Sequence, residues 1–189
     1  MDNKKSLQYY VNSSQLSKDV DKHYFSWQNI DEMCTKIVLD VNKDEHWRPD
    51  YIIGITRGGN IPATIISHMM NIRGEALKIN LRDNGQFSES NTWMAQDAFE
   101  GKNILIVDDI NDTGNTFNWL MEDWKKSVPS SKEDWDRTFG YNVRFATLVE
   151  NYASDFGLVK YYAYTVNKAE KDVWFVYPWE NTSIGEYDG

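Results

Sequence analysis

The chain of 189 residues has the length of one ordinary domain and can bury a core without disulfides. A hydrophobic content of 41% excludes a wholly disordered chain, and the single cysteine excludes an intrachain disulfide framework or a multi-cysteine metal site. With 20 basic and 29 acidic residues the net charge is −9, which argues against nucleic-acid binding through a general basic face.

The first 22 residues are polar and show little periodicity, so we predict a polar extension followed by a single domain over residues 23–189. They lack the apolar segment of a signal peptide. Nowhere does the sequence approach the roughly 20 apolar residues that a membrane span needs. We therefore expect a cytoplasmic protein that contacts no membrane.

A helix is predicted over residues 27–42, because apolar residues recur there at helical spacing and Ser26 can cap its first turn. Cys34 falls on the apolar stripe of this helix. A buried cysteine usually acts as a small core hydrophobe, so we do not assign Cys34 as a nucleophile.

Further along the chain, short apolar runs alternate with helical patterns. Residues 82–98 are polar and predict a loop, and residues 128–142 predict a loop or a short helix inserted at the surface. Strands are predicted at 51–56, 76–81, 103–107, 143–149, 161–166 and 173–177, and helices begin at 61 and at 115. This alternation is typical of a parallel sheet covered by helices.

The most informative segment, residues 104–116, reads as a buried strand that ends in Asp108 and Asp109, a polar turn, and the start of a helix. Ligands of open α/β sheets bind at the carboxyl ends of strands, and a helix start presents free N–H groups to an anion. Gly114, Thr113 and Thr116 therefore suggest a phosphate cradle. The paired acids suit sugar hydroxyls or Mg²⁺ held through water.

Three other interpretations fit parts of this segment. The spacing of Asp108, Asp109 and Asp112 is similar to the metal motif of prenyl synthases, but that motif lies on a helix. Asp112-Thr113-Gly114 is similar to the aspartic protease motif, but no apolar residues directly precede it. The acids could also form a turn that only caps a helix.

The whole of residues 104–116 resembles the diphosphoribosyl-binding motif of type I phosphoribosyltransferases. The resemblance implies an α/β fold with a mainly parallel five-stranded sheet, flanking helices and a small C-terminal hood, mainly residues 150–182. It implies transfer of a phosphoribosyl group from 5-phosphoribosyl-1-diphosphate (PRPP) with Mg²⁺ as cofactor. Thr113, Gly114, Asn115 and Thr116 would bind the 5′-phosphate, Asp108 and Asp109 the ribose hydroxyls, Asp109 also the metal, and Asp112 would exchange a proton at purine N7.

Two further segments extend this resemblance. Thr56-Arg57-Gly58-Gly59 follows a strand and opens a helix, and the family receives pyrophosphate at such a turn, here Arg57, Gly58 and Gly59. Residues 171–180 resemble the hood of bacterial xanthine–guanine phosphoribosyltransferases. That subgroup implies a purine base stacked on Trp174, read by backbone groups of Trp174 and Phe175, with Glu180 near an exocyclic amine.

The chain departs from this subgroup where the family places a lysine that donates to the purine 6-oxo group. Asn151 falls closest to that place, within residues 147–152. We expect a purine salvage enzyme for guanine, xanthine or hypoxanthine. A different base, or a regulator that senses PRPP or a nucleotide without turnover, remains open. Family members are usually dimers or tetramers, which implies a homo-oligomer with small-molecule substrates and no nucleic-acid partner.

Overall fold

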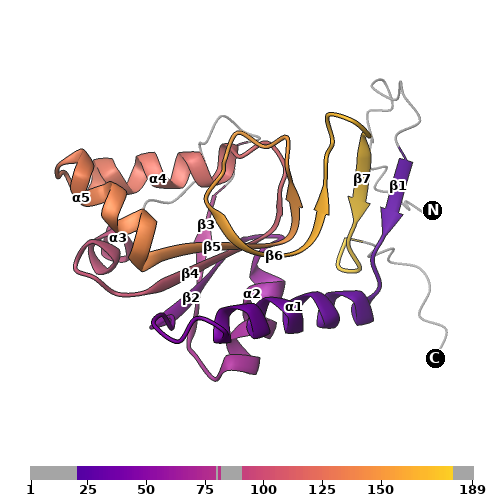
Figure 1. Ribbon diagram of the computed structural model, residues 1–189, viewed down its shortest axis with the longest axis horizontal. Helices are drawn as coiled ribbons and strands as arrows, with labels where there is room; N and C mark the ends of the chain where they lie inside the picture. Colours follow the sequence, from indigo (N-terminus) through magenta and orange to yellow (C-terminus); the bar gives the residue numbers. More distant parts are fainter. Residues whose placement is uncertain (1–20, 80, 82–90, 181–189) are drawn as a thin grey trace, which may run out of the picture.

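A computed structural model describes residues 21–79, 81 and 91–180 (Figure 1). Its main sheet has five parallel strands in the order β3-β2-β4-β5-β6. These strands are β2 (Tyr51–Thr56), β3 (Gly74–Lys78), β4 (Ile104–Asn111), β5 (Val143–Asn151) and β6 (Val159–Val166). The predicted five-stranded parallel sheet is therefore confirmed.

Helices cover both faces of this sheet because the inner strands are apolar on both sides (Figure 1). Helices α1 (Trp27–Asn42) and α2 (Asn60–Met70) pack on one face, where Ile52, Leu105 and Val107 join their core. The other face carries Ile53 and Ile106 and the elements α3 (Thr92–Phe99), α4 (Asn115–Ser127), α5 (Lys132–Arg137) and the π-helix η1 (Thr138–Asn142). Ser26 caps α1 as predicted, with its hydroxyl accepting from the Asn29 N–H at 3.2 Å.

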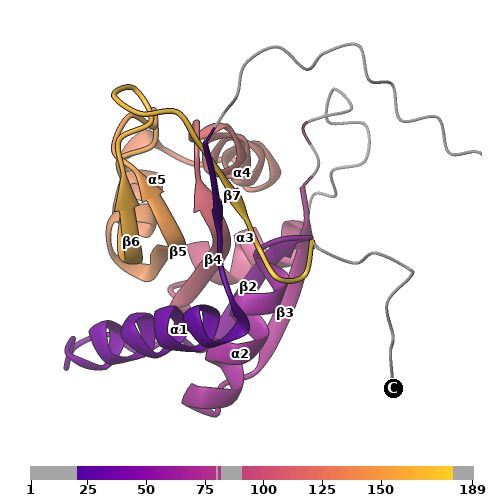
Figure 2. The same ribbon diagram turned by 90° about the vertical axis from the view of Figure 1, so that its right-hand side faces the viewer.

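A separate two-stranded sheet forms the hood at one end of the molecule (Figures 1 and 2). Strand β1 (Asp21–Tyr24) pairs in parallel with β7 (Val173–Val176). Two residues of the predicted 1–22 extension thus belong to a strand, whereas residues 1–20 lie outside the described residues. The hood range 150–182 also includes β6, which is an edge strand of the main sheet.

The prediction of a loop over residues 82–98 is wrong for its second half. Helix α3 begins at Thr92, and Met94, Ala95 and Ala98 are fully buried against α4 and the sheet. These three apolar positions share one helical face, but the polar residues around them hide the pattern in the sequence. Residues 82–90 lie outside the described residues.

Residues 128–142 contribute to the core and are not only a surface insertion. The short helix allowed by the sequence is present as α5, and η1 follows it directly. Trp135 and Phe139 are buried, with ring centroids 5.2 Å apart, and join the core beside α4. Among the described helices, none is long and apolar enough to cross a membrane.

Candidate active site

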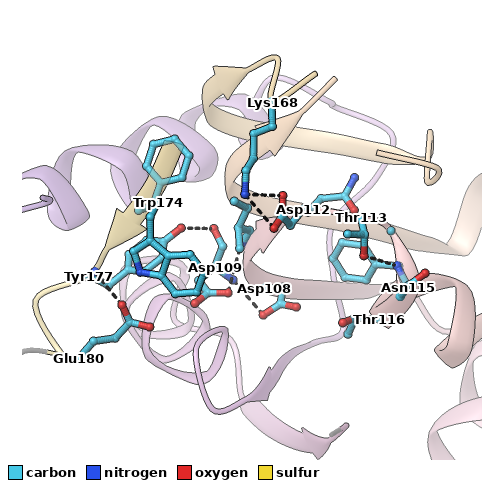
Figure 3. A pocket seen from close by; sticks show the side chains of 15 residues that line it. Asp108, Asp109, Asp112, Thr113, Asn115, Thr116, Lys168, Trp174, Tyr177 and Glu180 are labelled. Atoms are coloured by element: carbon cyan, nitrogen blue, oxygen red, sulfur yellow. Dashed lines mark hydrogen bonds and ion pairs between the residues drawn. The ribbon is translucent and has the colours of Figure 1, made fainter. Parts of the chain in front are cut away.

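Two acidic residues lie at the carboxyl end of β4, the central strand of the main sheet (Figure 3). Asp108 is buried, and its Oδ1 accepts the Asp109 N–H at 3.0 Å. Asp109 Oδ1 accepts the Ile110 N–H at 2.9 Å. These contacts leave oxygen atoms of both carboxylates available to a ligand, since a carboxylate can accept several hydrogen bonds.

Burial raises the pKa of both carboxyl groups, well above the usual range for Asp108. The charge of Asp109 raises the pKa of Asp108 further. A nearby cation or hydroxyl donors would lower the pKa of both carboxyl groups, because both favour the ionised form. The described residues contain no group of three or more metal-ligating side chains. Mg²⁺ commonly binds through one or two carboxylates together with substrate phosphates, so the pair fits a cation that arrives with a phosphorylated substrate.

The turn after β4 presents the start of α4 to the site. Gly114 has a φ of +87°, and a Cβ at this position would lie 2.7 Å from the Phe156 nitrogen, so glycine is required. Gly114 is also the N-cap of α4 and offers no side chain to the first N–H groups of the helix. Thr113 Oγ1 accepts one of them, from Asn115, at a long 3.4 Å. The helix start is therefore free to bind an anion.

The β2–α2 loop packs directly against the acidic pair. A side chain at Gly58 would collide with the Asp109 carboxylate, and a Cβ at Gly59 would lie 2.6 Å from the Asp108 Cα. Only glycines allow this approach. Arg57 is exposed on the same loop, next to these glycines. The structure thus brings the two loops predicted from the sequence together.

The hood lies over the acidic pair and supplies aromatic groups (Figure 3). Trp174 lines the pocket and is 51% exposed. Tyr177 donates from its hydroxyl to the Asp109 backbone oxygen at 3.0 Å. Its own N–H donates to Glu180 Oε2 at 3.1 Å, which positions Glu180 at the pocket wall.

Asn151 is buried, and its amide is bonded to backbone groups. Its Nδ2 donates to the Asp112 backbone oxygen at 2.8 Å. Its Oδ1 accepts from the backbone N–H groups of Ala153 and Lys168 at 3.1 and 3.0 Å. Asn151 is not among the residues that line the pocket. The structure therefore places it beneath the loop that carries Asp112.

The pocket unites most of the residues predicted for the site. The residues that line it include Asp108, Asp109, Asp112, Thr113, Gly114, Asn115, Thr116, Trp174, Phe175 and Glu180. Arg57, Gly58 and Gly59 lie on the adjoining loop. Lys168 and Tyr177 also line the pocket and were not predicted from the sequence. Tyr177 lies within residues 171–180, the segment that resembles the family's hood, which is a weak signal. No local pattern in the sequence pointed to Lys168.

The open parallel α/β sheet, the acidic pair, the free helix start and the overhanging aromatic side chain form an arrangement that has room and suitable groups for an anion beside a planar ring. The phosphoribosyl transferase domain family matches residues 22–181. This chain belongs to the phosphoribosyl transferase family, as the resemblance of residues 104–116 implied.

Individual relatives agree with this assignment. A hypoxanthine-guanine phosphoribosyltransferase of Schizosaccharomyces pombe is 28% identical, and the match covers 87% of this chain and 92% of the relative. A xanthine-guanine phosphoribosyltransferase of Idiomarina loihiensis is 26% identical over 160 residues, covering 83% and 86%. The crystal structure of a purine phosphoribosyltransferase from Pyrococcus horikoshii has a TM-score of 0.61 at 26% identity, covering 88% of this chain and 99% of that one.

Proposed function

We propose that this chain transfers the phosphoribosyl group of PRPP to a 6-oxopurine and releases pyrophosphate. The observation that carries the proposal is the juxtaposition of Asp108 and Asp109, the free start of α4, and Trp174 around one pocket. The names of the relatives from Schizosaccharomyces pombe and Idiomarina loihiensis support a 6-oxopurine as the base.

The donor would bind along the turn after β4. The backbone N–H groups at Gly114, Asn115 and Thr116 and the two threonine hydroxyls would hold the 5′-phosphate at the helix start. Asp108 and Asp109 would accept hydrogen bonds from the ribose hydroxyls. Because their burial disfavours the ionised form, these hydrogen bonds would stabilise the carboxylates as the sugar binds.

The diphosphate would lie toward the β2–α2 loop, which Gly58 and Gly59 allow to pack against the acidic pair. Arg57 would neutralise the charge that grows on pyrophosphate as it leaves. Asp109, with Asp108 beside it, would hold Mg²⁺. When bound, the metal ion would neutralise part of the negative charge of the diphosphate.

In the chemical step the purine N9 would form a bond to the ribose C1′ while the bond from C1′ to the pyrophosphate oxygen breaks. Pyrophosphate leaves with the bonding electrons, and the proton on N7 passes to the Asp112 carboxylate. Such a transition state has the oxocarbenium character of glycosyl transfer. The protein mainly has to position the two reactants, with Trp174 stacked on the base.

The direct test is turnover of the purified protein with PRPP, Mg²⁺ and single bases, followed by separation of the nucleotides. We expect product from at least one of guanine, xanthine and hypoxanthine. Product only from adenine, uracil or orotate would keep the family mechanism and refute the 6-oxopurine assignment. Tight PRPP binding without product from any base would instead support a ligand-sensing regulator.

A further inference from the structure

A buried acid that the proposed reaction does not use lies beneath the turn after β4. Glu150 is on β5, and its partner on the neighbouring strand is Asn111, the last residue of β4. Asn111 Nδ2 donates to Glu150 Oε1 at 3.0 Å. The contact therefore connects Glu150 to the residue at which the turn begins.

Asn111 also contacts the segment that packs against Gly114. Its Nδ2 donates to the Phe156 backbone oxygen at 3.1 Å, and its Oδ1 accepts from the Ser154 hydroxyl at 2.9 Å. The same hydroxyl accepts the Phe156 N–H at 3.2 Å. A Cβ at Gly114 would lie 2.7 Å from the Phe156 nitrogen and 3.0 Å from Ser154 Oγ. The position of the free start of α4 therefore depends on the hydrogen bonds of Asn111.

The hydrogen bonds around Glu150 fit an uncharged carboxylic acid. Its Oε1 accepts from the Asn111 amide, which also donates to the Phe156 oxygen, and the Thr147 hydroxyl lies at a long 3.5 Å from its Oε2. A buried carboxylate needs several good donors, whereas a protonated acid can itself donate from Oε2. The geometry therefore favours the protonated form.

The charges around Glu150 favour the same form. On β6, the Tyr162 hydroxyl interacts electrostatically with Glu150 and is bonded to Tyr152. The contacts from β4 and from β5 itself are the uncharged ones given above. Among the described residues, no lysine, arginine or histidine forms an ion pair with Glu150. Burial therefore raises the pKa of Glu150 to about 7.

This inference rests on the proposed function, in which the 5′-phosphate of PRPP binds at the start of α4. We propose that Glu150 is a positioning residue for that phosphate, and that as an uncharged acid it holds Asn111 and Ser154 in the arrangement that fixes the helix start. Loss of its proton would put a negative charge beneath a site that must take a phosphate and already contains the acidic pair. PRPP should therefore bind more weakly once Glu150 is ionised.

Calorimetry of PRPP binding, with Mg²⁺ and without a base, tests this at about pH 6 and about pH 8.5. Glu150→Gln imitates the protonated acid and cannot titrate. We expect its affinity to match that of the unmodified protein within about twofold at the lower pH and to be about 3- to 30-fold higher at the upper pH. Comparing the two proteins at one pH cancels the titration of the phosphates and of Asp108 and Asp109.

Glu122→Gln is the matched control, because it makes the same change on α4 at a side chain that is 61% exposed. It should follow the unmodified protein at both pH values. Ser154→Ala removes the hydroxyl that connects Asn111 to the Phe156 N–H and keeps Glu150. It should weaken PRPP binding about 3- to 10-fold at both pH values, and it provides a second variant if Glu150→Gln does not fold.

The outcomes separate this inference from the proposed function. If Glu150→Gln and the unmodified protein have equal affinities, or differ by the same factor at both pH values, the inference is overturned. A role of Glu150 in stability alone would change urea unfolding and leave the affinities equal. Unchanged PRPP binding by Ser154→Ala would also overturn it, and each of these results leaves the proposed function standing. If the unmodified protein binds no PRPP at either pH, the proposed function fails and the inference fails with it.

Discussion

Glu150 offers a test of the buried hydrogen-bond network beneath the turn after β4. It lies on β5 and is 7% exposed, and its Oε1 accepts from Asn111 Nδ2 at 3.0 Å. Asn111 in turn accepts from the Ser154 hydroxyl at 2.9 Å, close to Gly114. Burial raises the pKa of Glu150 from 4.5 to about 7. Glu150→Gln imitates the protonated acid and removes the titration.

The sign follows from proton linkage. Between 4.5 and about 7 the folded protein keeps the Glu150 proton while the unfolded chain has lost it, so the stability contributed by this group falls as the pH rises. Each unit of pKa difference corresponds to about 1.4 kcal/mol. Glu150→Gln should therefore gain about 2.5 kcal/mol of unfolding free energy relative to the unmodified protein between about pH 5 and about pH 8.

Urea unfolding of both proteins at the two pH values measures this difference. Glu122→Gln serves as the control, since the Glu122 side chain is 61% exposed and pairs only on the surface with Lys125 at 3.0 Å. The control should change stability by less than about 0.5 kcal/mol at either pH. A Glu150→Gln effect that is the same at both pH values would refute the assigned pKa shift and its cause.

Three substitutions test the site itself. Asp112→Asn should lower kcat about 10²- to 10⁴-fold while calorimetry finds PRPP affinity within about threefold, because it removes proton acceptance; equal losses would contradict that role. Trp174→Ala should raise the KM of the base about 5- to 100-fold with an unchanged melting temperature, since the side chain is 51% exposed. Tyr141→Ala, at a 57% exposed tyrosine, is its control and should leave KM unchanged. Gly59→Ala should cost about 1–3 kcal/mol in urea unfolding and weaken PRPP binding, because its Cβ would lie 2.6 Å from the Asp108 Cα; unchanged unfolding and binding would show that the loop can shift.

The sheet and the acidic loop were predictable because local signals there agree with the tertiary structure. The apolar run before Asp108 is fully buried, as expected for a central parallel strand. Gly114 and the helix after it were also predictable from local sequence, because a positive φ favours glycine and Gly114 directly precedes the start of α4. Consistency between sequence pattern and fold is strongest in such segments.

The errors arise where tertiary contacts decide the outcome. Residues 92–98 follow a polar segment and were assigned to the same loop, yet Met94, Ala95 and Ala98 form one buried helical face against the sheet. Asp21 and Lys22 are exposed in strand β1, so their hydropathy gives no strand signal, and only pairing with β7 defines the strand. Lys168 reaches Asp112 across 56 residues of sequence, a proximity that no local spacing encodes.

One strand of the hood, β7, both packs on the core and presents a side chain to the pocket. Alternate residues of a strand face opposite sides, so Phe175 and Trp174 on β7 point in different directions. Phe175 is buried and stacks on Phe25 at a centroid distance of 5.6 Å, whereas Trp174 is exposed at the pocket. A two-stranded sheet is at best marginally stable alone. The packing of Phe25 and Phe175 on the α1 side of the core therefore holds Trp174 over the acidic pair.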